Sequence, residues 1–175
     1  MHAELQVTTH FSFLRGASSP EELFAAAAHL GIGALGIVDR NSVAGMVRAW
    51  EAAKATGVRL VAGCRLDLVS GESLLVWPAD RAAWSRLTRL LSAARPLERV
   101  GGKWQGTSEC RIGWDEVAEW SEGLVAALVA DEPDPEALGR LKEIFGDRAY
   151  AAISWRRRPG DAVRIDALDR AARAA

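Results

Sequence analysis

The sequence has 175 residues, of which 49% are hydrophobic and 26% are charged, and its 22 Lys and Arg nearly balance its 23 Asp and Glu. This length suits one domain with a sizeable core, because domains commonly contain about 100 to 200 residues. The formal net charge of -1 argues against a domain that grips nucleic acid with a broad basic face. We therefore expect one soluble domain for which direct DNA binding is not the default function.

The two cysteines and the N-terminus indicate the cellular setting. Cys64 and Cys110 lie far apart and lack the neighbouring Cys or His that a structural zinc site needs, which fits a reducing compartment. No signal peptide is visible, and the longest uncharged run, residues 23–38, is shorter than the roughly 20 apolar residues that cross a bilayer. These features predict a cytoplasmic protein with no membrane partner.

The secondary-structure signals alternate between strand and helix. In chain order, the sequence predicts a strand at 3–9, a helix from Ser19 to Gly31, a strand at 32–38, a helix at 43–57, strands at 58–68 and 73–77, helices at 80–91 and 114–120, a strand at 124–129, a helix at 134–146, a strand at 149–155 and a terminal helix around 163–168.

Three local features of this pattern can be checked. Ser19-Pro20-Glu21-Glu22 predicts a capping box at a helix start. Trp50 on its helix and Trp155 at its strand end are predicted to pack in the core. Residues 95–113 lack a clear periodicity and predict a long surface loop.

The alternating order predicts an α/β fold. Strands that are apolar on both faces are typical of a parallel sheet covered by helices. A complete or partial barrel of (β/α) units, with mainly parallel strands and outer helices, is the leading architecture. A flat doubly wound sheet is the alternative, although the first strand lacks the Gly-x-Gly-x-x-Gly turn of dinucleotide-binding folds.

Two stretches resemble a known family. HFSFLRGASSPEEL (residues 10–23) and ALGIVDRNSVAGMVRAWEAAKATGVRLVAGCRLDL (residues 34–68) are similar to the N-terminal PHP domain of bacterial C-family (DNA polymerase III alpha-type) polymerases, especially the error-prone branch. The resemblance implies a distorted (β/α) barrel of the metallophosphoesterase type. In such barrels, His, Asp and Glu at the strand ends hold divalent metals that activate water against a phosphoester.

The sequence departs from that family pattern at its early ligand positions. The residues that match His-x-His are Gln6 and Thr8, the Asp-His pair is Asp39-Arg40, and the expected Glu after Gly-Cys is Arg65. Only Asp39 can coordinate a metal strongly, and two guanidiniums would repel one. Because of this departure, we expect no metal, no other cofactor and no catalytic residue on this chain.

Two hypotheses describe what replaced the metals. In the first, Arg65 and its neighbour Arg40 form an ion pair with Asp39, which would make the site structural. In the rival hypothesis, Arg40, Arg65 and the cluster Arg156, Arg157 and Arg158 form an anion site for phosphate or a nucleic-acid backbone. A Ser12, His10 and Asp39 triad is not expected, because no Gly-x-Ser-x-Gly elbow is present, and His10 is predicted to hydrogen-bond within a loop.

The resemblance implies a role in a larger protein. Residues 1–175 would be the N-terminal portion of a PHP domain, a single domain that stops before the later PHP motifs. This domain would be a non-catalytic structural or interaction module of an error-prone polymerase that acts in translesion synthesis, damage-induced mutagenesis and DNA repair. Mg or Mn would act only in the polymerase core, which would lie C-terminal to the chain.

The expected partners follow from the same resemblance. They are the rest of the polymerase chain, other replication or repair proteins, and DNA through the full-length protein. The alternative function is a free-standing PHP-type metal-dependent phosphoesterase, which the missing ligands disfavour.

Overall fold

The fold is given by a computed structural model that describes residues 2–95, 97–100, 103–106 and 110–175. The chain is α/β, as the sequence predicts, and it divides into two compact units, Met1–Leu66 and Asp67–Ala175. Within the described ranges, none of the helices combines the length and the hydrophobicity that crossing a bilayer requires.

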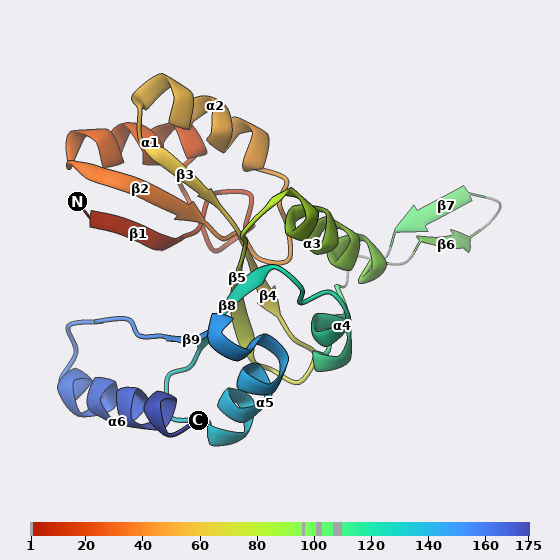
Figure 1. Cartoon of the computed structure of the whole chain (residues 1–175). Coiled ribbons are helices and arrows are strands. Elements are labelled where there is room, and N and C mark those ends of the chain that lie inside the picture. Colours follow the sequence, from red (N-terminus) through yellow and green to blue (C-terminus); the bar gives the residue numbers. More distant parts are fainter. Residues whose placement is uncertain (1, 96, 101–102, 107–109) are drawn as a thin grey trace. The chain divides into compact units, whose positions relative to one another are not determined.

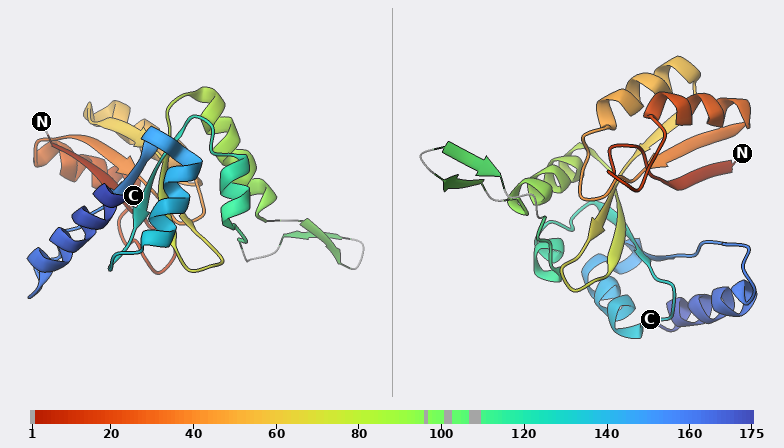
Figure 2. Two further views of the ribbon diagram at one scale, coloured as in Figure 1. Left: turned by 60° about the horizontal axis from the view of Figure 1, so that its bottom comes forward. Right: turned by 180° about the vertical axis from the view of Figure 1, so that it is seen from behind.

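The first unit is a parallel sheet with two helices on one face (Figures 1 and 2). Its strands are parallel, in the order β1 (His2–Val7), β2 (Ile32–Ile37) and β3 (Arg59–Ala62). The two helices, which lie side by side, are α1 (Pro20–His29) and α2 (Met46–Thr56). The central strand β2 has the most buried side chains, with Leu35 3% and Ile37 0% exposed. This arrangement confirms the predicted parallel strands and outer helices in this unit.

The helix starts confirm one prediction and correct another. The Ser19 hydroxyl accepts the Glu22 N–H at 3.2 Å and the Glu22 carboxylate accepts the Ser19 N–H at 2.8 Å, so the capping box forms. The predicted core position of Trp50 is wrong, because its side chain is 53% exposed. Helix α2 buries the small Ala49 and Ala52, and small side chains let a helix lie close to a sheet.

The second unit is built on a mixed sheet. Its strand order is β4 (Cys64–Asp67), β5 (Ser73–Pro78), β8 (Leu124–Val129) and β9 (Ala149–Ala152), with the unit boundary falling inside β4. Strands β8 and β9 are parallel, whereas β5 and β8 are antiparallel, so the mainly parallel arrangement does not extend to every pair. The helices are α3 (Arg81–Ala93), α4 (Trp114–Glu119), α5 (Pro135–Phe145), the short 3-10 helix η1 (Gly146–Arg148) and α6 (Asp161–Ala174).

Two predictions for the second unit are wrong. The predicted loop at 95–113 contains an antiparallel hairpin of β6 (Leu97–Val100) and β7 (Lys103–Gly106), because backbone pairing does not require an alternating apolar pattern. Strand β9 ends at Ala152, earlier than predicted, and Trp155 is 67% exposed. The chain has left the sheet before it reaches Trp155, so this side chain has no strand partner to pack against.

Candidate functional site

A buried carboxylate lies at the end of the central strand of the first unit. Asp39 follows β2 and is 1% exposed. Polar residues at the carboxyl ends of parallel strands commonly form the sites of α/β folds. Two hydroxyl residues from the loop after β1, Thr9 and Ser12, are also buried, with 0% and 3% exposed. We call Thr9, Ser12 and Asp39 the Asp39 cluster.

Three hydrogen bonds from neutral donors reach the Asp39 carboxylate. The Thr9 N–H donates to Oδ1 and the Thr9 hydroxyl to Oδ2, both at 2.8 Å, and the Ser12 hydroxyl donates to Oδ1 at 2.7 Å. The Ser12 oxygen in turn accepts the Arg40 N–H at 2.9 Å. A buried carboxylate needs such donors, because an ion that loses its water shell without compensating hydrogen bonds destabilises the folded protein by several kcal/mol. The cluster therefore ties the loop after β1 to the end of β2.

The loop can wrap around Asp39 because of one glycine. The Gly16 N–H donates to the Ser12 carbonyl at 3.0 Å, and the Ser12 N–H donates to the Thr9 carbonyl at 3.0 Å. A Cβ atom at position 16 would lie 2.0 Å from the Thr9 carbonyl oxygen. Only glycine permits this approach of two backbone segments. The Thr9-to-Gly16 turn is thus fixed by backbone geometry as well as by Asp39.

The backbone after Asp39 also pairs with β4. The Arg65 N–H donates to the Asp39 carbonyl at 3.0 Å, and the Asn41 N–H donates to the Arg65 carbonyl at 2.7 Å, so that Arg40 and Arg65 form a parallel bridge. The buried Cys64 thiol lies 3.3 Å from the Asp39 carbonyl oxygen. The structure therefore brings together three of the predicted site positions, Asp39, Arg40 and Arg65. An ion pair between Asp39 and either arginine stays a prediction.

His10 and Ser12 do not form a nucleophile pair. The His10 Nδ1 donates to the Ser18 carbonyl at 3.2 Å, and its ring stacks on Phe11 with the centroids 4.6 Å apart. The loop role predicted for His10 is confirmed. Because the Ser12 hydroxyl donates directly to Asp39, its proton is already held by a carboxylate inside a buried network.

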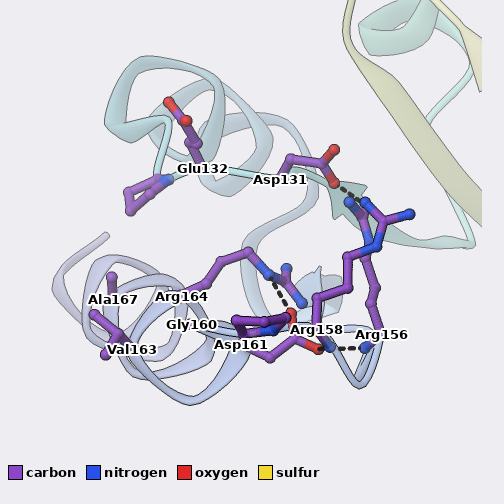
Figure 3. A pocket seen from close by; sticks show the side chains of 11 residues that line it. Asp131, Glu132, Arg156, Arg158, Gly160, Asp161, Val163, Arg164 and Ala167 are labelled. Atoms are coloured by element: carbon purple, nitrogen blue, oxygen red, sulfur yellow. Dashed lines mark hydrogen bonds and ion pairs between the residues drawn. The ribbon is translucent and has the colours of Figure 1, made fainter.

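The arginines of the second unit form a separate feature. We call Arg156 to Gly160 the arginine loop; it leads into α6 beside a pocket of about 660 Å³ (Figure 3). The Asp161 carboxylate accepts the backbone N–H groups of Arg156 at 2.6 Å and Arg158 at 3.3 Å. The Arg164 Nε donates to the same carboxylate at 3.2 Å, and the Arg156 guanidinium pairs with Asp131.

Two carboxylates of this region are held in the ionised form. Burial raises the pKa of Asp161, but hydrogen bonds from the Arg158 and Arg156 amides and from the Arg164 guanidinium outweigh burial, so the pKa lies below its usual value. The hydrogen bond from Arg156 lowers the pKa of Asp131 in the same direction. The exposed Asp131 side chain makes this second pair a surface ion pair, which contributes little to stability.

Sequence reasoning found some of these residues and missed others. The sequence predicts Asp39 and the arginines as site residues. It also places the family's His-x-His match at Gln6 in β1 and at Thr8 just after β1, both half-buried, but it does not predict the fully buried Thr9. The signal for Thr9 and Ser12 is two hydroxyl residues in the loop that precedes a capped helix. Asp161 is not predicted, because a side chain that accepts hydrogen bonds from loop amides leaves no periodic pattern in the sequence.

These features define an α/β domain with a buried carboxylate at a strand end, and comparison with known proteins identifies its class. The PHP domain family model matches residues 4–162, and the chain therefore belongs to the PHP domain family. It is 57% identical over 170 residues to "Error-prone DNA polymerase 2" of Rhizobium meliloti, which covers 95% of this chain and 15% of that protein. "Error-prone DNA polymerase 3" of Agrobacterium fabrum is 55% identical over 167 residues, covering 94% and 15%. The chain thus spans about 15% of the length of these relatives.

Solved structures share the fold. A protein described as a metal-dependent phosphoesterase, from Bifidobacterium adolescentis, has a TM-score of 0.68 and 17% identity, covering 99% of this chain and 84% of its own. An amidohydrolase from Chromobacterium violaceum has a TM-score of 0.58 and 16% identity, covering 86% and 76%. At these identities, the likeness concerns the fold alone.

The residues at the positions where the family resemblance predicts metal ligands do not suit a divalent metal. The carboxylate oxygens of Asp39 already accept three hydrogen bonds from Thr9 and Ser12. The matching positions otherwise supply an amide at Gln6, a hydroxyl at Thr8 and guanidiniums at Arg40 and Arg65. Among the described residues, no three His, Cys, Asp or Glu side chains lie close enough to share a metal ion. Metal-bound hydrolysis needs several such ligands, and no reaction step is assigned to this site.

Proposed function

We propose that this chain is a non-catalytic PHP module of an error-prone DNA polymerase. Its high identity to the N-terminal regions of such polymerases supports this proposal. In the parent protein, DNA-directed nucleotide transfer would occur in a polymerase core outside this chain, with Mg or Mn bound there. Such a polymerase would work in the cytoplasm in translesion synthesis, damage-induced mutagenesis and DNA repair. Its module would contact the rest of the polymerase and other replication or repair proteins.

The observation that supports a non-catalytic role is that the Asp39 carboxylate is buried and hydrogen-bonded through both oxygens. A catalytic carboxylate must be accessible to a metal, a proton donor or a substrate. Here both oxygens accept hydrogen bonds at 2.7 to 2.8 Å, and the residue is 1% exposed. The carboxylate therefore connects the loop after β1 to the sheet, which is a structural role.

Metal binding tests this role directly. We would titrate the 175-residue chain with Mn²⁺ and Zn²⁺ by isothermal titration calorimetry and measure hydrolysis of a phosphodiester dye substrate with each metal. We expect no saturable binding and no turnover above that of the metal alone. The matched variants are Asp39→Ala and Asp166→Ala, since Asp166 is an exposed carboxylate on α6.

One outcome would overturn the non-catalytic role. Saturable metal binding, or turnover, that disappears in Asp39→Ala and persists in Asp166→Ala would establish a metal-dependent phosphoesterase. The polymerase assignment is tested separately, by reading the coding DNA beyond codon 175. A reading frame that continues into a polymerase core supports the assignment, and a stop codon contradicts it.

A further inference from the structure

We propose that Trp155 and the arginine loop form a contact site for single-stranded nucleic acid. In this site, a base stacks on the Trp155 ring and phosphates bind the guanidiniums of Arg157 and Arg158. The proposal goes beyond the structural role of the module, because it gives the module a ligand of its own. It depends only on the second unit and not on the state of Asp39.

The first observation is that an aromatic side chain and the three arginines that follow it in the chain are all exposed. Trp155 is 67% exposed, and the three arginines that follow it are exposed as well. Burying this indole ring against a ligand would be favourable, because it would remove a large apolar surface from water. The adjacent guanidiniums make the surface suitable for an anionic ligand with flat groups.

The second observation is that the backbone of the loop is already fixed. The Asp161 carboxylate, whose side chain is 6% exposed, accepts the N–H groups of both Arg156 and Arg158. Arg157 between them has a φ of 55°, and Gly160 has a φ of 85°. The backbone therefore directs two amides to Asp161, while the side chains of Arg156 and Arg158 extend away from that carboxylate toward Asp131 (Figure 3). The Arg157 side chain is exposed. A preformed loop binds a ligand with little further loss of entropy.

The third observation concerns the charges that remain available. Arg156 pairs with Asp131 and Arg164 pairs with Asp161, so these two charges are largely compensated. In the part of the chain that the structure describes, Arg157 and Arg158 have no ion pair. Arg157, and Arg158 which also acts electrostatically on Asp131, follow the exposed Trp155 in the chain. Guanidiniums together with an exposed aromatic ring are the groups by which proteins contact single strands, through phosphate and base together.

Another tryptophan of the same chain provides an internal comparison. Trp50 is also exposed, at 53%, but the Lys54 ammonium lies 3.8 Å from its ring centroid. A cation over the ring occupies the face that a base would need. None of the described cations lies over Trp155. Trp155, rather than Trp50, therefore has a ring face open for stacking.

The exposed ring also distinguishes among anionic ligands. An acidic peptide would use the guanidiniums but would gain little from the indole. Duplex DNA keeps its bases stacked inside the helix, so its bases could not reach Trp155 without unpairing. A single strand presents both the phosphates and the base faces that this surface matches.

The test is fluorescence anisotropy of a labelled oligothymidylate with the 175-residue chain at several salt concentrations. We expect saturable binding that weakens as salt increases. Trp155→Leu should weaken binding roughly 5- to 150-fold, as expected for the loss of one stacked base. Arg157→Ala with Arg158→Ala should reduce the slope of log affinity against log salt by about 1.4, as expected for the loss of two phosphate contacts.

Matched controls separate this site from a general charge effect. Trp50→Leu removes an exposed tryptophan, and Arg81→Ala with Arg89→Ala removes the same charge from exposed positions of α3. Both controls should bind the oligonucleotide like the unmodified chain. Circular dichroism of each variant checks that the fold is retained.

Three results would overturn the proposal. The first is no binding at low salt, and the second is an equal loss in the control variants. The third is displacement of the oligonucleotide by a polyglutamate peptide with undiminished binding in Trp155→Leu, which would assign the loop to an acidic peptide. Each of these results leaves the proposed structural role unaffected, because that role depends on Asp39.

Discussion

The Asp39 cluster and the arginine loop each stabilise a buried carboxylate, but with different kinds of hydrogen-bond donor. Each has a carboxylate that is almost fully buried, Asp39 at 1% and Asp161 at 5% exposed. Asp39 is stabilised mainly by side-chain hydroxyls, from Thr9 and Ser12. Asp161 is stabilised by two backbone amides and by Arg164.

The difference decides which groups each loop can offer to a ligand. In the Asp39 cluster, the polar side chains point inward and are used up by the carboxylate. In the arginine loop, the backbone supplies two of the donors to Asp161, and the side chains of Arg156, Arg157 and Arg158 are exposed. When side-chain hydroxyls donate the hydrogen bonds to a buried carboxylate, those hydroxyls are not available to a ligand. When backbone amides donate them, the side chains of the same loop can remain exposed.

The largest expected effect is on the turn of the Asp39 cluster. Gly16→Ala places a Cβ atom 2.0 Å from the Thr9 carbonyl oxygen, and the backbone must move to relieve the contact. We expect the free energy of unfolding to fall by about 4 kcal/mol, measured by urea denaturation.

Gly139→Ala is the matched control for this substitution. Gly139 lies in α5, and a Cβ atom there would meet nothing within 4 Å. Because alanine favours helix, we expect a gain of up to about 1 kcal/mol. An equal loss in both variants would show that the close approach at Gly16 is not the cause.

The next largest effect comes from removing the acceptor of the cluster. Asp39→Ala leaves the Thr9 and Ser12 donors buried without a partner, and we expect a loss of about 3 kcal/mol in the free energy of unfolding. Asp39→Asn keeps one carbonyl oxygen as an acceptor and should cost only about 1 kcal/mol. If Asp39→Ala were as stable as the unmodified chain in urea denaturation, the structural role of the cluster would be excluded.

The smallest effect is the pH dependence contributed by Asp161. Its pKa in the folded protein lies below the ordinary value of about 3.9, so Asp161 contributes stability above that pH and loses it as the pH falls through the folded pKa. Asp161→Asn cannot lose a proton and lacks this contribution. We therefore expect the urea midpoints of the two proteins to differ at neutral pH and to converge on acidification below about pH 4.

The control for this effect is Asp166→Asn, an exposed carboxylate of the same helix that pairs with Arg170. Its difference from the unmodified chain should be smaller at neutral pH, because an exposed ion pair contributes little to stability. A gap between Asp161→Asn and the unmodified chain that stays constant down to pH about 2 would contradict the assigned role of the Asp161 carboxylate.

Much of the fold follows from local sequence signals. The capping box at Ser19, the strand around Leu35 and the helices that begin after Asp80 and Asp134 form as predicted, because each depends on residues within a few positions of one another. The predicted core positions of Trp50 and Trp155 are wrong. Helical periodicity places Trp50 on an apolar face, but it does not predict that the small Ala49 and Ala52 would pack against the sheet and leave Trp50 exposed.

The sequence by itself determined that this chain has the PHP pattern, and it predicts that Asp39 alone remains among the early metal positions, because both conclusions depend only on residue identity and order. Only the tertiary structure decided what surrounds that carboxylate. Thr9 and Ser12 lie 30 and 27 positions before Asp39, and a hydrogen bond across that separation leaves no periodic signal in the chain. The structure was also needed to show that Asp161 accepts the backbone N–H groups of Arg156 and Arg158, because these contacts lie in a loop and follow neither the helix nor the strand period.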